Sequence, residues 1–172
     1  MTAEVVVPHT RAEYECAKMK GRMNWEEAVK DPYYKGSKIE EWEIGFIGED
    51  VVAKYFGVYP HYNKNRSDVF GFQVRSINRE KNHLIIRESD KKYRRHIYIL
   101  VYVDHQKYRH KILGWILCDD AMTDKYRKKI FRRYDPDGAD YVWMVPPSDL
   151  KSVEKIGRTF IHKKICERRK NK

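Results

Sequence analysis

Residues 68–75 read DVFGFQVR, a carboxylate followed by an amide and then by a cation two residues beyond the amide. Because successive side chains of an extended strand point to opposite faces, Gln73 and Arg75 are predicted to share one face of a strand. Phe72 and Val74 are then free to pack on the opposite face. The stretch therefore predicts a half-buried strand that carries part of a metal-and-phosphate site.

The rest of the chain has the composition of one globular domain. Its 172 residues are 41% hydrophobic and 13% aromatic, enough to build a hydrophobic core without disulfide bonds or a structural metal. With 36 Lys+Arg against 25 Asp+Glu, the formal net charge is +11, which makes a polyanion the first partner to test. Three dispersed cysteines without a CxxC pair disfavour a zinc site or a disulfide framework. With no signal-peptide pattern and no long apolar span, we expect a cytoplasmic protein that is neither secreted nor membrane-bound.

Helices are expected at the front of the chain and strands in its middle. Expected helices cover residues 10–20, 24–30, 37–56, where Gly57 is the stop signal, and the basic stretch 124–134. Runs rich in β-branched and aromatic residues predict strands at 72–77, 83–87, 96–104, 111–117 and 141–145. This order predicts a three-layer α/β domain around one mixed sheet. We divide it into an N-terminal helical segment packed on the core (1–36), the core itself (37–150) and a basic C-terminal tail (151–172).

The long expected helix carries one charged residue within its apolar face. Its apolar stripe is formed by Ile39, Trp42, Phe46, Ala53 and Phe56, and Glu49 interrupts it. A carboxylate in such a stripe is costly unless it is paired, hydrogen-bonded or bound to metal. Glu49 is therefore a candidate second carboxylate for the site. The alternative is a glutamate at the edge of the stripe that reaches water.

Hydrolysis of a phosphodiester uses a divalent ion to neutralise the phosphate, together with a cation that steadies the developing charge. Hard ions prefer oxygen ligands. The predicted ligands of Mg²⁺ or Mn²⁺ are oxygen atoms of Asp68, Gln73, Glu49 and the backbone carbonyl of Val74. Arg75 is the predicted positive group facing the phosphate.

These residues resemble the signature of the PD-(D/E)XK nuclease superfamily. In order, IGEDVVAKYFGV, SDVFGFQVRS, HLIIRESD, YILVYVD, LGWILCDDAM and YVWMVPPSDL are similar to segments of a group of small phage and bacterial proteins assigned to it. The resemblance implies a restriction-endonuclease-like core, with a mixed central sheet flanked by helices, that binds magnesium and cuts DNA. Asp68 matches the metal-binding aspartate, Gln73 the glutamate or glutamine position and Arg75 the lysine position. It also suggests a phage origin and hence the host cytoplasm.

Two departures from this pattern keep other functions open. Gln73 is neutral and coordinates a cation more weakly than glutamate, and Arg75 stays protonated and cannot act as a base. The first hypothesis is a metal-dependent DNA endonuclease. A homodimer is compatible with this hypothesis, because enzymes of this kind often cut duplex DNA as dimers. The second is a catalytically degenerate protein of the same fold that binds nucleic acid without cutting. The third is an interaction module for an acidic host protein.

Cations outside the motif are candidates for contacts with the phosphate backbone. They are Arg87, Lys128, Lys129, Arg132, Arg133, Lys163 and Lys164. The tail at 151–172 holds nine Lys/Arg and two Glu, and the alternative is that tail and helix are solvated surfaces that keep the protein soluble. For Arg87, a salt bridge to Asp90 or Glu88 is the favoured interpretation.

Overall fold

The computed structural model describes residues 4–32, 34, 36–58, 69, 71–132 and 135–156, and the side chains of 131–140 lie outside this description. The described strands are β1 (Val5–Pro8), β2 (Phe72–Ile77), β3 (Leu84–Arg87), β4 (Ile97–Tyr102), β5 (Arg109–Leu117), β6 (Arg127–Arg132) and β7 (Asp135–Val145). The helices are α1 (Arg11–Ala28), α2 (Ile39–Phe56) and α3 (Cys118–Ala121), with 3₁₀ turns η1 (Glu88–Tyr93), η2 (Pro147–Asp149) and η3 (Val153–Lys155). Among these helices, none has the length and apolar character needed to span a membrane.

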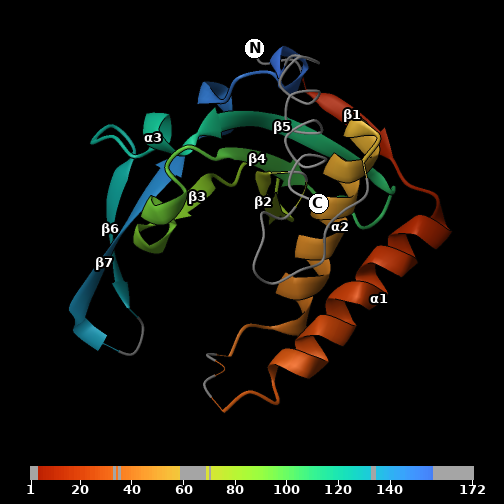
Figure 1. The fold of residues 1–172 in the computed structure, drawn as a ribbon, viewed down its shortest axis with the longest axis horizontal. Coiled ribbons are helices and arrows are strands. Elements are labelled where there is room, and N and C mark those ends of the chain that lie inside the picture. Colours follow the sequence, from red (N-terminus) through yellow and green to blue (C-terminus); the bar gives the residue numbers. More distant parts are fainter. Residues whose placement is uncertain are drawn as a thin grey trace, which may run out of the picture.

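The strands form two sheets, and the larger one is mixed (Figure 1). In the four-stranded sheet, ordered β1-β5-β4-β2, strands β2 and β4 are parallel and the other neighbours are antiparallel. Strands β3, β7 and β6 form the second, antiparallel sheet. The mixed α/β class is therefore as expected, but the expected single sheet is wrong, because β3 pairs with β7 in the second sheet. A parallel pair needs a crossover connection, and β3 together with η1 lies within that connection.

Each face of the four-stranded sheet is covered by a different layer. On one face, Val74 and Ile99 pack in a core with Ile47 and Val51 of α2. On the other face, side chains of β4 and β5 pack with β3 and β7, in a second core that includes Tyr98, Leu100, Leu113, Ile86 and Val145. In Figure 1 the long helices lie together on one side of the molecule, and the β6–β7 hairpin projects away on the other.

One continuous helix, α1, replaces the two short helices expected near the N-terminus. Thr10 begins it with a capping box, in which its hydroxyl accepts from the Glu13 amide and Glu13 accepts from the Thr10 amide. Asn24, at the expected start of the second short helix, lies inside α1 and donates its side-chain amide to the Lys20 carbonyl at 2.9 Å. Gly21 does not break α1, because it lies where α2 approaches: a Cβ there would be 2.8 Å from the Cα of Glu43.

Helix α2 ends as expected, but its buried face does not match the expected stripe. Gly57 stops it in the left-handed conformation, with a φ of 64°. The buried positions are Glu43, Ile47, Gly48, Val51, Val52 and Ala53, so of the expected stripe only Ala53 is fully buried. The cause is that α2 packs against α1 as well as against the sheet, so its buried surface is wider than one stripe.

The basic stretch expected as a helix at 124–134 forms strand β6 instead. Its residues pair antiparallel with β7, and β7 itself begins six residues earlier than the expected strand at 141. Lys and Arg favour helices only weakly, so pairing with the aromatic and β-branched residues of β7 decides the structure. Strand β1 was not expected, and it pairs with β5 through the sequence VVVP.

Candidate functional site

Strand β2 presents Gln73 and Arg75 to the sheet face away from α2. Val74 packs in the core on the helix side, and a Cβ at Gly48 of α2 would collide with the side chain of Ser76. Gln73 and Arg75, the alternate residues, stand beside Tyr98 and Leu100 of the parallel neighbour β4. The expected alternation of β2 is thus present, and it directs the two motif side chains toward η1.

Arg75 is held by a carboxylate that the sequence argument did not assign to the site. Its Nη2 lies 3.3 Å from both carboxylate oxygens of Asp90, in η1, and its guanidinium carbon lies 5.1 Å from the ring centroid of Tyr98. Asp90 is 7% exposed and also accepts the backbone N–H of Arg87 at 3.0 Å. The Asp90 carboxylate is therefore bonded to the Arg87 main chain and to the Arg75 side chain, whereas the expected salt bridge was to the Arg87 guanidinium.

Two further polar side chains lie on this face of the sheet, those of Tyr98 and Gln73. The hydroxyl of Tyr98 is buried and has no hydrogen-bond partner among the described residues, and burial together with the nearby Asp90 carboxylate raises the pKa of Tyr98. Gln73, the register partner of Tyr98, is 6% exposed. A buried hydroxyl such as that of Tyr98 carries a desolvation cost. The group formed by Gln73, Arg75, Asp90 and Tyr98 is here called the β2 polar group.

The other predicted site residues do not join the β2 polar group. Glu49 is half-buried on α2, the helix that covers the opposite face of the sheet. The buried carboxylate of α2 is Glu43, 8% exposed, which accepts two hydrogen bonds from Arg22 at 2.8 and 3.2 Å. The Val74 carbonyl accepts from the Arg75 guanidinium at 3.3 Å. Asp68 lies outside the described residues.

The oxygen donors that the described residues place on this face of the sheet are few. On the face of Gln73 and Arg75 the β2 polar group offers one carboxylate, Asp90, and Arg75 already compensates its charge. Magnesium sites usually use one or two carboxylates that are not neutralised in this way. In the part of the chain that the structure describes, no group of three or more His, Cys, Asp or Glu side chains could hold a metal ion.

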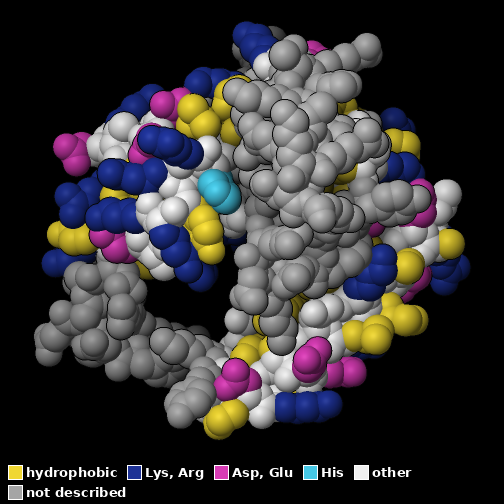
Figure 2. Space-filling model, in the orientation of Figure 1, with side chains coloured by type: hydrophobic (Ala, Val, Ile, Leu, Met, Phe, Trp, Pro, Cys, Tyr) yellow, Lys and Arg dark blue, Asp and Glu magenta, His cyan; other side chains and the backbone are white. Residues whose placement is uncertain are grey.

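A cationic surface lies on the three-stranded sheet and η1. Residues Arg127, Lys128, Lys129 and Ile130 of β6 are all exposed, as are Lys91 and Lys92 of η1 and Arg87 at the end of β3. Arg87 and Lys128 both oppose Val142, so they share one face of this sheet. Figure 2 shows Lys and Arg side chains gathered on this side of the molecule. Of the other predicted phosphate contacts, the Arg132 side chain, Arg133, Lys163 and Lys164 lie outside the described residues.

Aromatic rings accompany these cations. The guanidinium carbon of Arg127 lies 3.9 Å from the ring centroid of Tyr141, and the Lys91 ammonium lies 5.9 Å from that of Trp143. Register places Arg127 opposite Trp143 and Lys129 opposite Tyr141, so these four side chains share one face of the hairpin. Because a helix was expected over this stretch, the pairing of its cations with β7 was not predicted.

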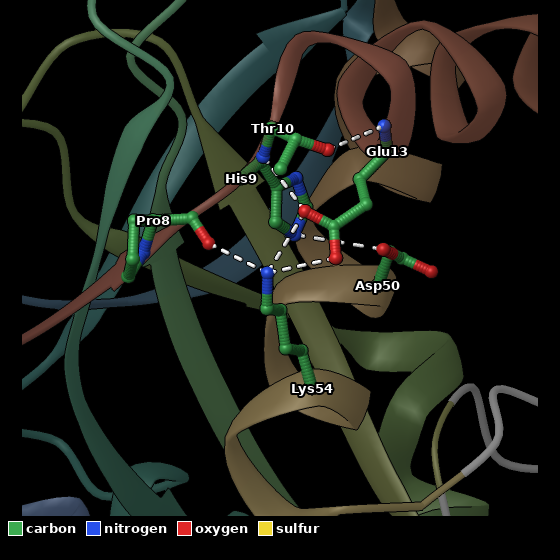
Figure 3. A network of polar contacts seen from close by, with 6 residues as sticks. All are labelled: Pro8, His9, Thr10, Glu13, Asp50 and Lys54. Atoms are coloured by element: carbon green, nitrogen blue, oxygen red, sulfur yellow. Dashed lines mark hydrogen bonds and ion pairs between the residues drawn. The ribbon is translucent and has the colours of Figure 1, made fainter.

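On the helix side, by contrast, the polar groups are tied to one another (Figure 3). Lys54 of α2 donates to the Pro8 carbonyl at 2.9 Å and to both Glu13 oxygens at 2.8 and 2.9 Å. The hydrogen bonds that Glu13 accepts from Lys54 and from the Thr10 backbone N–H lower the pKa of Glu13 to about 2. His9 Nε2 lies 3.5 Å from the Asp50 carboxylate, and its ring meets that of buried His110 edge-on at 4.7 Å. Burial lowers the pKa of both histidines, that of His110 to about 4.

Comparison of the chain with protein-family models, with curated proteins and with solved structures returned no match. The geometry of the described residues is therefore the basis for the proposals that follow.

Proposed function

We propose that this protein binds nucleic acid through the cationic surface of β3, η1 and β6. The observation that carries the proposal is the run of exposed cations on β6, Arg127, Lys128 and Lys129, next to the lysines of η1. Phosphate backbones are the polyanions that attract such surfaces, and a chain of net charge +11 is drawn to them at long range.

The placement of the cations favours a polynucleotide over an acidic protein. Arg87 and Lys128 lie on one face of the three-stranded sheet, whereas Arg127 lies on the other, beside Tyr141. Cations on both faces of one strand can contact a long polyanion that carries a negative charge on every nucleotide. Aromatic rings among the cations add a surface on which bases can stack.

The test is binding of labelled DNA, followed by fluorescence anisotropy across a series of salt concentrations. Removing three cations in Arg87→Gln/Lys92→Gln/Lys128→Gln should weaken binding and lower the slope of log K against log salt by about 2 to 3. The matched control, Arg11→Gln/Lys30→Gln/Lys38→Gln, removes the same charge from exposed positions on the helix side. Equal losses in both triple variants, or no binding at low salt, would contradict the proposal.

A second proposal retains the reaction that the resemblance implies, cleavage of DNA with Mg²⁺ or Mn²⁺ by a restriction-endonuclease-like core. It is supported by Gln73 and Arg75 standing on one face of a strand in a mixed four-stranded sheet, five and seven residues after Asp68. When bound, a divalent ion would neutralise the phosphate. Asp68 and Gln73 are the oxygen donors proposed for it, and Arg75 would steady the negative charge of the phosphate.

Supercoiled plasmid, incubated with Mg²⁺ or Mn²⁺ or with a chelator, tests this second proposal. Nicking should require the metal and should disappear in Asp68→Ala, whereas Asp124→Ala, a change at an exposed aspartate, should cut like the unaltered protein. If plasmid is bound but never nicked, even by Gln73→Glu/Arg75→Lys, the second proposal fails and the first one stands.

A further inference from the structure

The Arg127–Tyr141 pair forms an open, positively charged platform on the β6–β7 hairpin. The Tyr141 side chain is 39% exposed although it lies on a strand, and the Arg127 guanidinium lies over its ring at 3.9 Å. Trp143, two residues further along β7, is 5% exposed and carries Lys91 at 5.9 Å from its ring centroid. The same face therefore presents one exposed ring with Arg127 over it and Lys91 near the neighbouring Trp143.

Such a platform has the chemistry of a nucleobase site. Bases stack on aromatic rings and on the plane of an arginine guanidinium, and this contact tolerates any base. A guanidinium above a tyrosine ring adds a cation–π component. Lys91, next to Trp143, and Lys129, the register partner of Tyr141, stand where the phosphates on either side of a stacked base would pass.

Stacking of this kind selects unpaired bases, because the faces of bases inside a duplex are covered by their neighbours. We propose that the β6–β7 face binds a single-stranded segment of nucleic acid, with one base stacked on the Arg127–Tyr141 pair. This inference rests on the proposed nucleic-acid binding and adds to it the class of substrate. Single-stranded DNA and single-stranded RNA share the necessary chemistry.

The simpler role for the pair is structural, since a cation–π contact also ties β6 to β7. The two roles differ in what a change at Tyr141 does. Tyr141→Leu keeps an apolar side chain that suits a strand but removes the ring, so a purely structural role predicts a lower melting temperature and unchanged binding. Tyr141→Trp keeps a stacking ring and adds a fluorophore that a stacked base quenches. Tyr55→Leu, at a half-buried tyrosine of α2, is the matched control.

The experiment measures anisotropy of labelled oligonucleotides of about 12 nucleotides, as single-stranded DNA, single-stranded RNA and duplex DNA. The unaltered protein should prefer one or both single strands to the duplex. Tyr141→Leu should weaken single-strand binding by about tenfold, with less than a twofold change for the duplex and little change in the salt slope. Tyr141→Trp should retain binding and lose fluorescence on adding the single strand.

A preference for duplex DNA, or equal effects of Tyr141→Leu and Tyr55→Leu, would overturn this inference. Binding lost in Arg87→Gln/Lys92→Gln/Lys128→Gln but kept in Tyr141→Leu would also overturn it while leaving the proposed nucleic-acid binding intact. Absence of binding to all three oligonucleotides at low salt, with capture of an acidic peptide instead, would contradict both.

Discussion

The helix side and the hairpin side of this molecule use the same residue types in opposite ways. At the junction of β1, α1 and α2, Lys54 is bonded to Glu13 and to a main-chain carbonyl, and Glu43 is held by Arg22. On the hairpin, the cations of β6 are exposed, and their contacts include an aromatic ring rather than a compensating carboxylate for Arg127. The comparison teaches that cations serve cohesion on one side and are exposed at the surface on the other.

Acid should destabilise the helix side through its buried histidines. The folded-state pKa of His110 is lowered to about 4 from 6.5, so the folded protein favours the neutral form of this histidine. The contribution of His110 to the free energy of unfolding is therefore fully present above pH 6.5. As pH falls from 6.5 to 4, the unfolded chain takes up the proton first, and the free energy of unfolding should drop by about 2 to 3 kcal/mol. The groups facing the two rings are Asp50 and Lys54 of α2, Glu13 and Tyr14 of α1, and Asp104 and His105 after β4.

Urea unfolding at several pH values checks this expectation. In His110→Leu the free energy of unfolding should depend less on pH between 6.5 and 5, where few carboxylates titrate. The same change removes the hydrogen bond that the Asp104 amide donates to His110 Nδ1. An unchanged slope in that variant would contradict the assignment of the effect to His110.

Adding a methyl group between α1 and α2 should have the next largest effect. In Gly21→Ala the new Cβ would lie 2.8 Å from the Cα of Glu43 and from the Trp42 carbonyl, which are main-chain atoms that yield only if the helices move apart. Unfolding free energy should fall by about 2 kcal/mol. Gly45→Ala, which meets nothing within 4 Å, should be neutral or stabilising by about 0.5 kcal/mol. Equal urea midpoints for the two variants would contradict the close approach.

The smallest expected effect is the loss of unfolding free energy when one ion pair is removed from each side of the molecule. Lys54→Met removes hydrogen bonds to Glu13 and to the Pro8 carbonyl and should cost about 1 kcal/mol. Lys91→Met removes an exposed pair with Glu88, three residues away in η1, and should cost less than about 0.5 kcal/mol. A larger loss of stability in Lys91→Met than in Lys54→Met would reverse the contrast between the two sides.

Local patterns in the sequence were sufficient for β2, β4 and β5 of the large sheet and for the end of α2, but not for β1. The run FQVRSI gave the bounds of β2, and Gly57 gave the stop of α2, because both depend on neighbouring residues alone. The helix expected at 124–134 was wrong because the helix propensity of lysine and arginine is small in free energy, and antiparallel pairing with β7, the next strand along the chain, outweighs it.

The candidate site was only partly predictable for a related reason. Gln73 and Arg75 share a face because strands alternate, which the sequence reveals. Asp90 reaches Arg75 only because the parallel pairing of β2 and β4 brings η1 across that face, and no local signal marks this. Glu49 was chosen over Glu43 because the expected stripe assumed one buried face, whereas α2 packs on two sides.

The edge position of β6 affects whether copies of this chain associate with one another. It has one strand neighbour among the described strands and forms the edge of its sheet, a position where main-chain groups can pair with another molecule. Consecutive Arg127, Lys128 and Lys129 at this edge repel a second copy. Neutralising them, by salt or by a bound polyanion, would lower the barrier to edge-to-edge association, so colloidal stability and ligand occupancy are linked through the same three side chains.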